Sequence, residues 1–174
     1  MIHILIHIPH SSIKIPEKYR HQITLSDFEL ADELLKMTDH YVDDLFDIPG
    51  CTVQYNPNSR LVMDPERFRD DKEELMSREG MGLAYTKTSD GKTLRHLTDL
   101  EREDIVRLLY DPYHEEITNK VDTILSRHNK CLIIDAHSFP SRPLPYEHNE
   151  ETESDRSDIC LGYSNYHAGS NLIK

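Results

Sequence analysis

The sequence lacks the features that mark several classes of protein. No apolar run approaches the roughly 20 residues of a membrane-spanning helix, and no basic segment precedes an apolar one near the N-terminus, as a secretory signal would require. There are only three cysteines, Cys51, Cys131 and Cys160. An odd number in predicted strands fits buried small hydrophobes better than a disulfide framework. These absences predict a soluble cytoplasmic protein.

Clusters of positive charge are also missing. The chain has 20 basic and 32 acidic residues, a formal net charge of −12, and no basic run long enough to follow a phosphate backbone. We therefore expect neither nucleic acid nor a membrane as a partner. At 174 residues, of which 37% are apolar, a single globular domain over residues 1–174 is expected.

What the sequence does contain is two apolar runs that each lead into a histidine. Residues 2–8 are followed by His10, and residues 131–134 are followed by His137. Such runs predict buried strands, and ligands of open parallel sheets bind at the carboxyl ends of strands. If the strands are neighbours, the two histidines supply half of a catalytic zinc site. Taken singly, any of the 11 histidines is more often an ordinary core or surface residue.

A carboxylate on a predicted helix is the candidate third ligand. The helical period over residues 27–46 gives one apolar stripe, and Asp39 falls where a second apolar line would continue. A carboxylate on an apolar face is costly unless it is paired or binds a cation. Alternatively, Asp39 sits at the edge of the face, where water or a backbone amide satisfies it.

The remaining pattern predicts a three-layer α/β/α domain with a mixed sheet. We expect further strands at residues 51–55 and 158–163, a hairpin at 84–96, and a long helix at 98–128 that is broken near Asp111-Pro112.

Two arginines follow the second predicted strand. Arg60 and Arg67 lie in the segment 59–67, where one guanidinium could stabilise an oxyanion and another could grip a substrate carboxylate. Local sequence alone favours a plainer interpretation, surface ion pairs with Asp64, Glu66 and other nearby acidic residues.

Six strings in order resemble the N-formylglutamate amidohydrolase family over essentially the whole chain. They are IPHSS (8–12), MTDHYVD (37–43), SRLVMDPER (59–67), DAHSFPS (135–141), LPYE (144–147) and DICLG (158–162). The resemblance implies a fold similar to zinc carboxypeptidases and aspartoacylases. It also implies hydrolysis of N-formyl-L-glutamate to L-glutamate and formate by metal-activated water, as in histidine catabolism.

Residue by residue, the resemblance implies zinc held by His10, His137 and, as the third ligand, Asp39. It implies Arg60 as the catalytic arginine, with Arg67, Ser138 and Tyr146 binding a small acidic substrate. Glu66 stands where the aspartoacylase string has asparagine.

The family places its general-base glutamate on a later strand, so the resemblance implies a domain cut short at its C-terminus. We expect an exposed edge at residues 158–163 that favours self-association. Two alternatives stay open: a catalytically impaired remnant or binding module on the same scaffold, and a deacylase of another N-acyl amino acid.

Overall fold

A computed structural model describes residues 2–144 and 156–162 of the chain. Its contacts divide the chain into two compact units, residues 1–139 and 140–174. All the helices and strands described below belong to the first unit. No helix in the described ranges is both long and apolar enough to cross a membrane.

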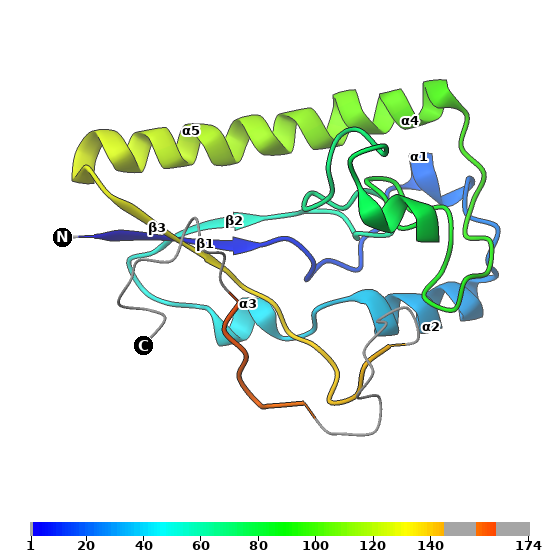
Figure 1. Ribbon diagram of the computed structural model, residues 1–174, viewed down its shortest axis with the longest axis horizontal. Helices are drawn as coiled ribbons and strands as arrows, with labels where there is room; N and C mark the ends of the chain where they lie inside the picture. Colours follow the sequence, from blue (N-terminus) through cyan, green and yellow to red (C-terminus); the bar gives the residue numbers. More distant parts are fainter. Residues whose placement is uncertain (1, 145–155, 163–174) are drawn as a thin grey trace. The chain divides into compact units, whose positions relative to one another are not determined.

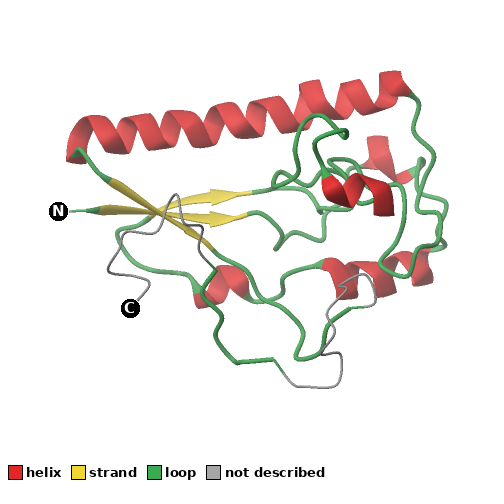
Figure 2. Cartoon of the chain, in the orientation of Figure 1, coloured by secondary structure: helices red, strands yellow, loops and turns green. Residues whose placement is uncertain are grey.

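Three parallel strands form the sheet, β1 (His3–Ile8), β2 (Thr52–Tyr55) and β3 (Cys131–Asp135), in the order β2-β1-β3 (Figures 1 and 2). Each connection between them crosses over through helices, which parallel pairing requires. The α/β class is therefore confirmed. The expected mixed sheet is not seen, because every strand in the described part of the chain runs in the same direction.

The sheet is buried unevenly. In β1, Leu5, Ile6 and Ile8 are all fully buried, as the sequence predicts. In β3, Leu132 and Ile133 are each 48% exposed, so the prediction of a second buried strand is wrong. The reason is position, since β3 is an edge strand and β1 is central.

The predicted helix over residues 27–46 is two helices, α2 (Asp27–Met37) and α3 (Val42–Leu45). A capping box between Ser26 and Glu29 begins α2 as expected. The continuous helix was wrong because the Asp39 amide donates to the His10 carbonyl (3.0 Å), outside the helical pattern. Tyr41 then has a left-handed backbone (φ 64°), and its side chain points into solvent, ending the predicted apolar stripe.

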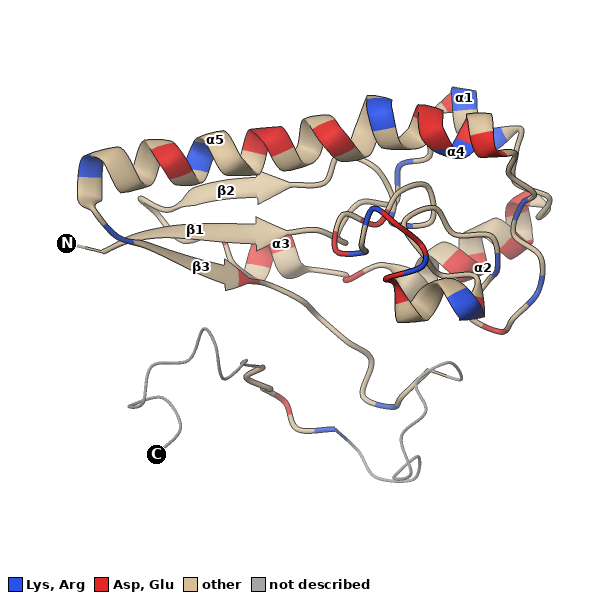
Figure 3. Cartoon of the chain, turned by 45° about the horizontal axis from the view of Figure 1, so that its top comes forward, with Lys and Arg blue, Asp and Glu red and all other residues tan. Residues whose placement is uncertain are grey.

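The long helical region is continuous but irregular. It consists of α4 (Asp99–Ile105), a π-helical turn η2 (Val106–Tyr110) and α5 (Asp111–His128). The predicted break is thus a widened turn just before Pro112, which has no amide hydrogen to donate. Figure 3 shows acidic and basic residues interspersed along α4 and α5.

Both faces of the sheet meet helices. Val42 and Phe46 at α3 pack with Ile6 and Ile8 of β1 on one face. On the other, the α5 residue Lys120 donates to the Val53 carbonyl of β2 (3.0 Å). A second core joins the loops to η2; its buried members include Tyr19, Val62, Met63, Leu83, Ile105 and Val106.

The segments between β1 and α2 and between β2 and α4 form short helices and turns. Helix α1 (Glu17–Arg20) and the 3₁₀ helix η1 (Leu75–Glu79) are brief. The expected hairpin at 84–96 is a tight turn with one antiparallel bridge, Lys87 to Thr93, and a glycine at positive φ, Gly91. Buried Arg95 donates to the carbonyls of Tyr85 (2.7 Å) and Val62 (2.8 Å), which fixes the segment that carries Arg60 and Arg67.

The second unit has no helix or strand among its described residues, 140–144 and 156–162. The predicted strand at 158–163 is therefore wrong over residues 158–162, and residue 163 lies outside the described ranges. A strand needs a hydrogen-bonded partner strand. The described residues of this unit are joined by a hydrogen bond from the Arg156 amide to the Ser141 carbonyl (3.0 Å), which forms no strand pairing.

Candidate metal centre

The carboxyl ends of β1 and β3 bring His10 and His137 together. His7 is in register with Asp135, and the Ala136 amide donates to the His7 carbonyl (2.8 Å). The two segments therefore continue side by side at the carboxyl ends of β1 and β3. The ring centroids of the two histidines are 5.2 Å apart. His10 is buried, whereas the His137 side chain is 35% exposed. The predicted juxtaposition is therefore present.

Asp39 joins this pair from the connection between α2 and α3. Its Oδ2 lies 2.9 Å from Nδ1 of His137 and 3.9 Å from Nδ1 of His10. Asp39 is buried, so the interpretation as a solvated residue at a helix edge is wrong. The residue is also not on a helical face, because the chain leaves the helix at Thr38.

The opposite side of the His10 ring contacts Asp64, a residue outside the predicted site. The fully buried Asp64 accepts hydrogen bonds from His10 Nε2 (2.9 Å), Arg60 Nη2 (2.8 Å) and the Tyr85 hydroxyl (2.8 Å). Burial acts to raise the pKa of this carboxyl, but Arg60 and His10 outweigh it and hold the pKa well below its usual range. Asp64 therefore remains charged and ties Arg60 to the histidine.

The two predicted arginines lie beside this carboxylate and not on a solvated surface. Arg60 places Nε and Nη2 on Asp64 Oδ2, and its side chain is only 12% exposed. Arg67 lies 3.6 Å from the same oxygen and donates to the Met81 carbonyl (3.2 Å). The ion pair with Asp64 that local sequence suggests is thus real, but it is buried.

Two further carboxylates approach the Nε2 atoms. Glu66 lies with Oε2 3.3 Å from His10 Nε2 and Oε1 3.3 Å from His137 Nε2. Asp135 lies with Oδ2 3.5 Å from His137 Nε2. Burial acts to lower the pKa of His137, but bonds to Asp135, Asp39 and Glu66 prevail and raise it to about 12. The surroundings of His137 therefore strongly favour positive charge.

Hydrogen bonds through His7 connect Asp135 to Tyr113 of α5. Its Oδ1 lies 2.7 Å from His7 Nδ1, and His7 Nε2 lies 2.5 Å from the Tyr113 hydroxyl. Burial raises the pKa of Tyr113, so its hydroxyl keeps its proton for this bond. The network satisfies both nitrogens of His7 without a further ligand.

The nitrogen atoms indicate where a cation fits. His10 Nδ1 is buried and makes no hydrogen bond, which is costly for a polar atom. It faces the same side as Asp39 and the Nδ1 of His137. The Nε2 of His10 is already bonded to Asp64, and a carboxylate on one imidazole nitrogen fixes the tautomer that offers the other to a metal.

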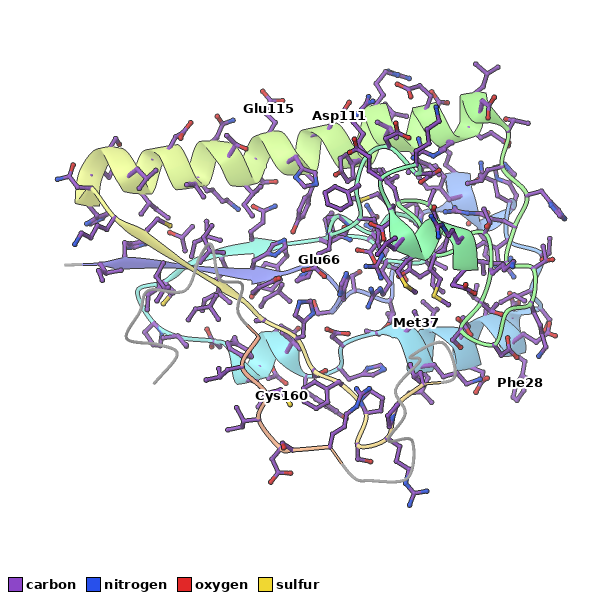
Figure 4. The ribbon with its side chains drawn as sticks, in the orientation of Figure 1. Phe28, Met37, Glu66, Asp111, Glu115 and Cys160 are labelled. Carbon is purple, nitrogen blue, oxygen red and sulfur yellow. The ribbon has the colours of Figure 1, made fainter. Side chains whose placement is uncertain are left out.

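Two histidines and a carboxylate with an open position are a donor set that zinc prefers. Of the possible sets among the described residues that include both histidines, the one whose three ligand atoms lie within 4.8 Å of one another contains Glu66 and not Asp39. That alternative uses the Nε2 atoms, which face carboxylates already, and it leaves His10 Nδ1 without a partner. The residue types therefore fit zinc, and the unbonded His10 Nδ1 together with the bonded Nε2 favours the Nδ1 side. Figure 4 shows Glu66 beyond the end of β1.

Besides Arg67, two residues are predicted to bind substrate, and the structure describes one of them. Ser138 follows His137, and its hydroxyl donates to the His40 carbonyl (2.8 Å), which ties β3 to the connection that carries Asp39. Tyr146 lies outside the described residues. Asp64, Glu66 and Asp135 were not predicted as members of the centre, although all three lie in the strings that contain Arg60 and His137.

Comparison with known proteins agrees with the fold and the strings. The sequence model of the N-formylglutamate amidohydrolase family matches residues 2–173. A crystal structure of N-formylglutamate amidohydrolase from Ralstonia eutropha JMP134 is similar, with a TM-score of 0.70 and 22% identity over 80% of this chain and 55% of that one.

A gene product of Agrobacterium tumefaciens is similar with a TM-score of 0.55 and 21% identity, over 79% of this chain and 52% of that one. The chain thus spans about half the length of these two solved structures. A search of curated proteins finds no match.

Proposed function

The chain belongs to the N-formylglutamate amidohydrolase family, and on that basis we propose a zinc-dependent amidohydrolase that converts N-formyl-L-glutamate to L-glutamate and formate. The observation that carries the zinc dependence is the buried His10 Nδ1, which has no hydrogen bond and faces Asp39 and His137. We further propose a three-layer, zinc-carboxypeptidase-like domain that acts in the cytoplasm in histidine catabolism.

His10, Asp39 and His137 would hold the metal through two imidazole nitrogens and one carboxylate oxygen. When bound, zinc supplies a Lewis acid and lowers the pKa of a coordinated water to about 7. Asp64 keeps the His10 ring in the orientation that directs Nδ1 to the metal. The Asp39 backbone amide donates a hydrogen bond to the His10 carbonyl. This bond holds the Asp39 carboxylate against both rings.

The arginines would bind the negative charges of substrate and transition state. Arg60 is held in place by Asp64 and Tyr85, so a developing oxyanion meets a donor that needs little reorganisation. Arg67 is the more exposed of the two, at 21% against 12%. It would receive a substrate carboxylate, and we propose Ser138 and Tyr146 as further substrate-binding residues.

Formate release from N-formylglutamate by the 174-residue chain tests the proposal. We expect turnover by zinc-loaded protein, loss of turnover after removal of metal by a chelator, and recovery on addition of zinc. His137→Ala is the inactive control. Zinc binding without turnover of any substrate would instead favour the binding module.

A short panel of substrates separates the remaining alternative. N-formylglutamate, N-formylaspartate and N-acetylglutamate differ in side-chain length or acyl group while all remain acidic. Faster turnover of N-acetylglutamate than of N-formylglutamate would favour a deacylase of another N-acyl amino acid. We expect the formyl group and the glutamate side chain together to give the highest kcat/KM.

A further inference from the structure

We infer that Glu66 is a positioning residue that holds both imidazoles of the proposed zinc centre by their Nε2 atoms. The inference rests on the proposed function, because it requires zinc on the Nδ1 side of His10 and His137. Glu66 is also the residue that replaces the asparagine of the aspartoacylase string. Its role therefore has to be derived from its contacts in this chain.

The two oxygens of Glu66 reach different rings. Oε2 lies 3.3 Å from His10 Nε2, and Oε1 lies 3.3 Å from His137 Nε2. The other carboxylates on this side serve one ring each, Asp64 at His10 and Asp135 at His137. Among the described residues, Glu66 is therefore the one carboxylate within ion-pair distance of both Nε2 atoms.

The position of Glu66 is set by the same buried carboxylate that orients His10. The Glu66 amide donates to Asp64 Oδ1 (3.0 Å), and the Glu66 side chain is 23% exposed. A partly buried carboxylate beside two imidazoles favours a proton on each Nε2. A proton on Nε2 directs a metal to Nδ1; at His137 zinc would take the place of the hydrogen bond between Nδ1 and Asp39 (2.9 Å). Outer partners of this kind raise the basicity of the ligand.

The competing role for Glu66 is that of a ligand. Ligation through Nε2 would remove the 2.9 Å bond between His10 and Asp64, a carboxylate with no exposure at all. It would also leave His10 Nδ1 buried and unbonded. Both changes are costly, so the contacts favour positioning by Glu66 and ligation by Asp39.

Zinc affinity measured by competition with a colorimetric chelator distinguishes these roles. Glu66→Gln keeps the size of the side chain but leaves one oxygen to accept from one ring, and we expect about 10- to 100-fold weaker binding. Asp39→Asn removes a ligand and should weaken binding at least about tenfold further than Glu66→Gln. The exposed Glu73→Gln is the control and should bind zinc as wild type does.

The melting temperature of each metal-free variant is measured in parallel. A role of Glu66 in folding alone would lower that temperature and leave zinc affinity unchanged, which would overturn the inference. If Glu66→Gln does not fold, Glu66→Asp keeps the charge on a side chain too short to span both rings, and it should also weaken zinc binding.

The outcomes separate this inference from the proposed function. Wild-type affinity in Glu66→Gln, with tight zinc binding by the wild type, overturns the positioning role alone. A greater loss in Glu66→Gln than in Asp39→Asn makes Glu66 a ligand and also overturns it. Absence of zinc binding by the wild type overturns the proposed function itself.

Discussion

The first unit contains two pairs of neighbouring histidines at opposite ends of its sheet. The distances between the paired rings are similar, but the charged residues around the two pairs differ. His10 and His137 lie beyond the carboxyl ends of the strands, with ring centroids 5.2 Å apart. His3, at the start of β1, stacks on His128, at the end of α5, with centroids 4.9 Å apart and an interplanar angle of 13°.

The surroundings of the two pairs set them apart. Four carboxylates, Asp39, Asp64, Glu66 and Asp135, lie within ion-pair distance of His10 or His137. His3 instead bonds to the Thr52 hydroxyl (2.9 Å), in a groove of about 340 Å³ that Lys120 and Arg127 also line. The nearby Glu116 is paired with Lys120 (2.8 Å).

This comparison shows that neither short distance nor cavity volume identifies a metal centre. Zinc needs neutral imidazole nitrogens that are directed to one point and carboxylates that offset its charge. The carboxyl ends of the strands bring two imidazoles together with four carboxylates, which agrees with where ligands bind in open parallel sheets. At the other end of the sheet, the stacked rings of His3 and His128 lie beside Lys120 and Arg127.

Removal of one histidine from each pair gives the largest expected contrast. Wild-type protein purified without chelator should contain about one equivalent of zinc, because the site needs two imidazoles and a carboxylate. His137→Ala should contain none, and His128→Ala should match the wild type. Full zinc content in His137→Ala, measured by elemental analysis, would contradict the assignment.

The arginines sharpen the contrast at the level of rate. Arg60→Ala should lower kcat by about 10²–10³, the usual cost of losing one oxyanion donor, and Arg67→Ala should mainly raise KM for N-formylglutamate. Arg69 serves as the matched control, since it is exposed and paired with Asp111 (3.1 Å) away from the centre. Steady-state kinetics with unchanged constants in both Arg60→Ala and Arg67→Ala would remove these roles.

Asp64 should carry the largest effect on stability. Asp64→Asn leaves the buried Arg60 without its anion, and loss of one partner of a buried pair typically costs about 3–5 kcal/mol. Denaturant unfolding of metal-free protein measures this change. Glu116→Gln breaks an exposed pair at the other end of the sheet and should cost no more than about 1 kcal/mol. Equal losses in the two variants would mean that the buried bonds of Asp64 to His10, Arg60 and Tyr85 do not stabilise the fold as proposed.

The smallest effect is expected at the stacked pair. His3→Ala removes one ring contact and the bond to Thr52, which together should lower the free energy of unfolding by about 1 kcal/mol. Zinc content should not change. A fall in zinc content would show that the two ends of the sheet are coupled, against the comparison drawn here.

The sequence predicts the strand ends well because their signals are local. The alternation of residues 2–8 and the apolar run at 131–134 predict β1 and β3, and the histidines that follow them converge as expected. Helical periodicity places Asp39 on the apolar face of one helix, but the residue lies between two helices. The helix is interrupted by a hydrogen bond from the Asp39 amide to the His10 carbonyl. This bond is a tertiary contact, so helical periodicity does not predict it.

The buried network of hydrogen bonds around Asp64 could not be predicted in this way. In sequence, Arg60 and Asp64 four residues apart look like an exposed ion pair, and only burial separates the two cases. Likewise, Glu66 and Asp135 resemble ordinary acidic residues until the fold places them against His137. Charge networks that join distant segments have no local pattern.

Nitrogen chemical shifts of the histidine rings test the central claim most directly. Two-bond proton–nitrogen spectra of ¹⁵N-labelled protein report which ring nitrogen carries a proton and which binds zinc. With one equivalent of zinc, we expect His10 and His137 to bind through Nδ1 and to keep a proton on Nε2, while His3 and His128 do not change. Zinc on either Nε2, or shifts at His3 and His128 in place of these two, would contradict the account.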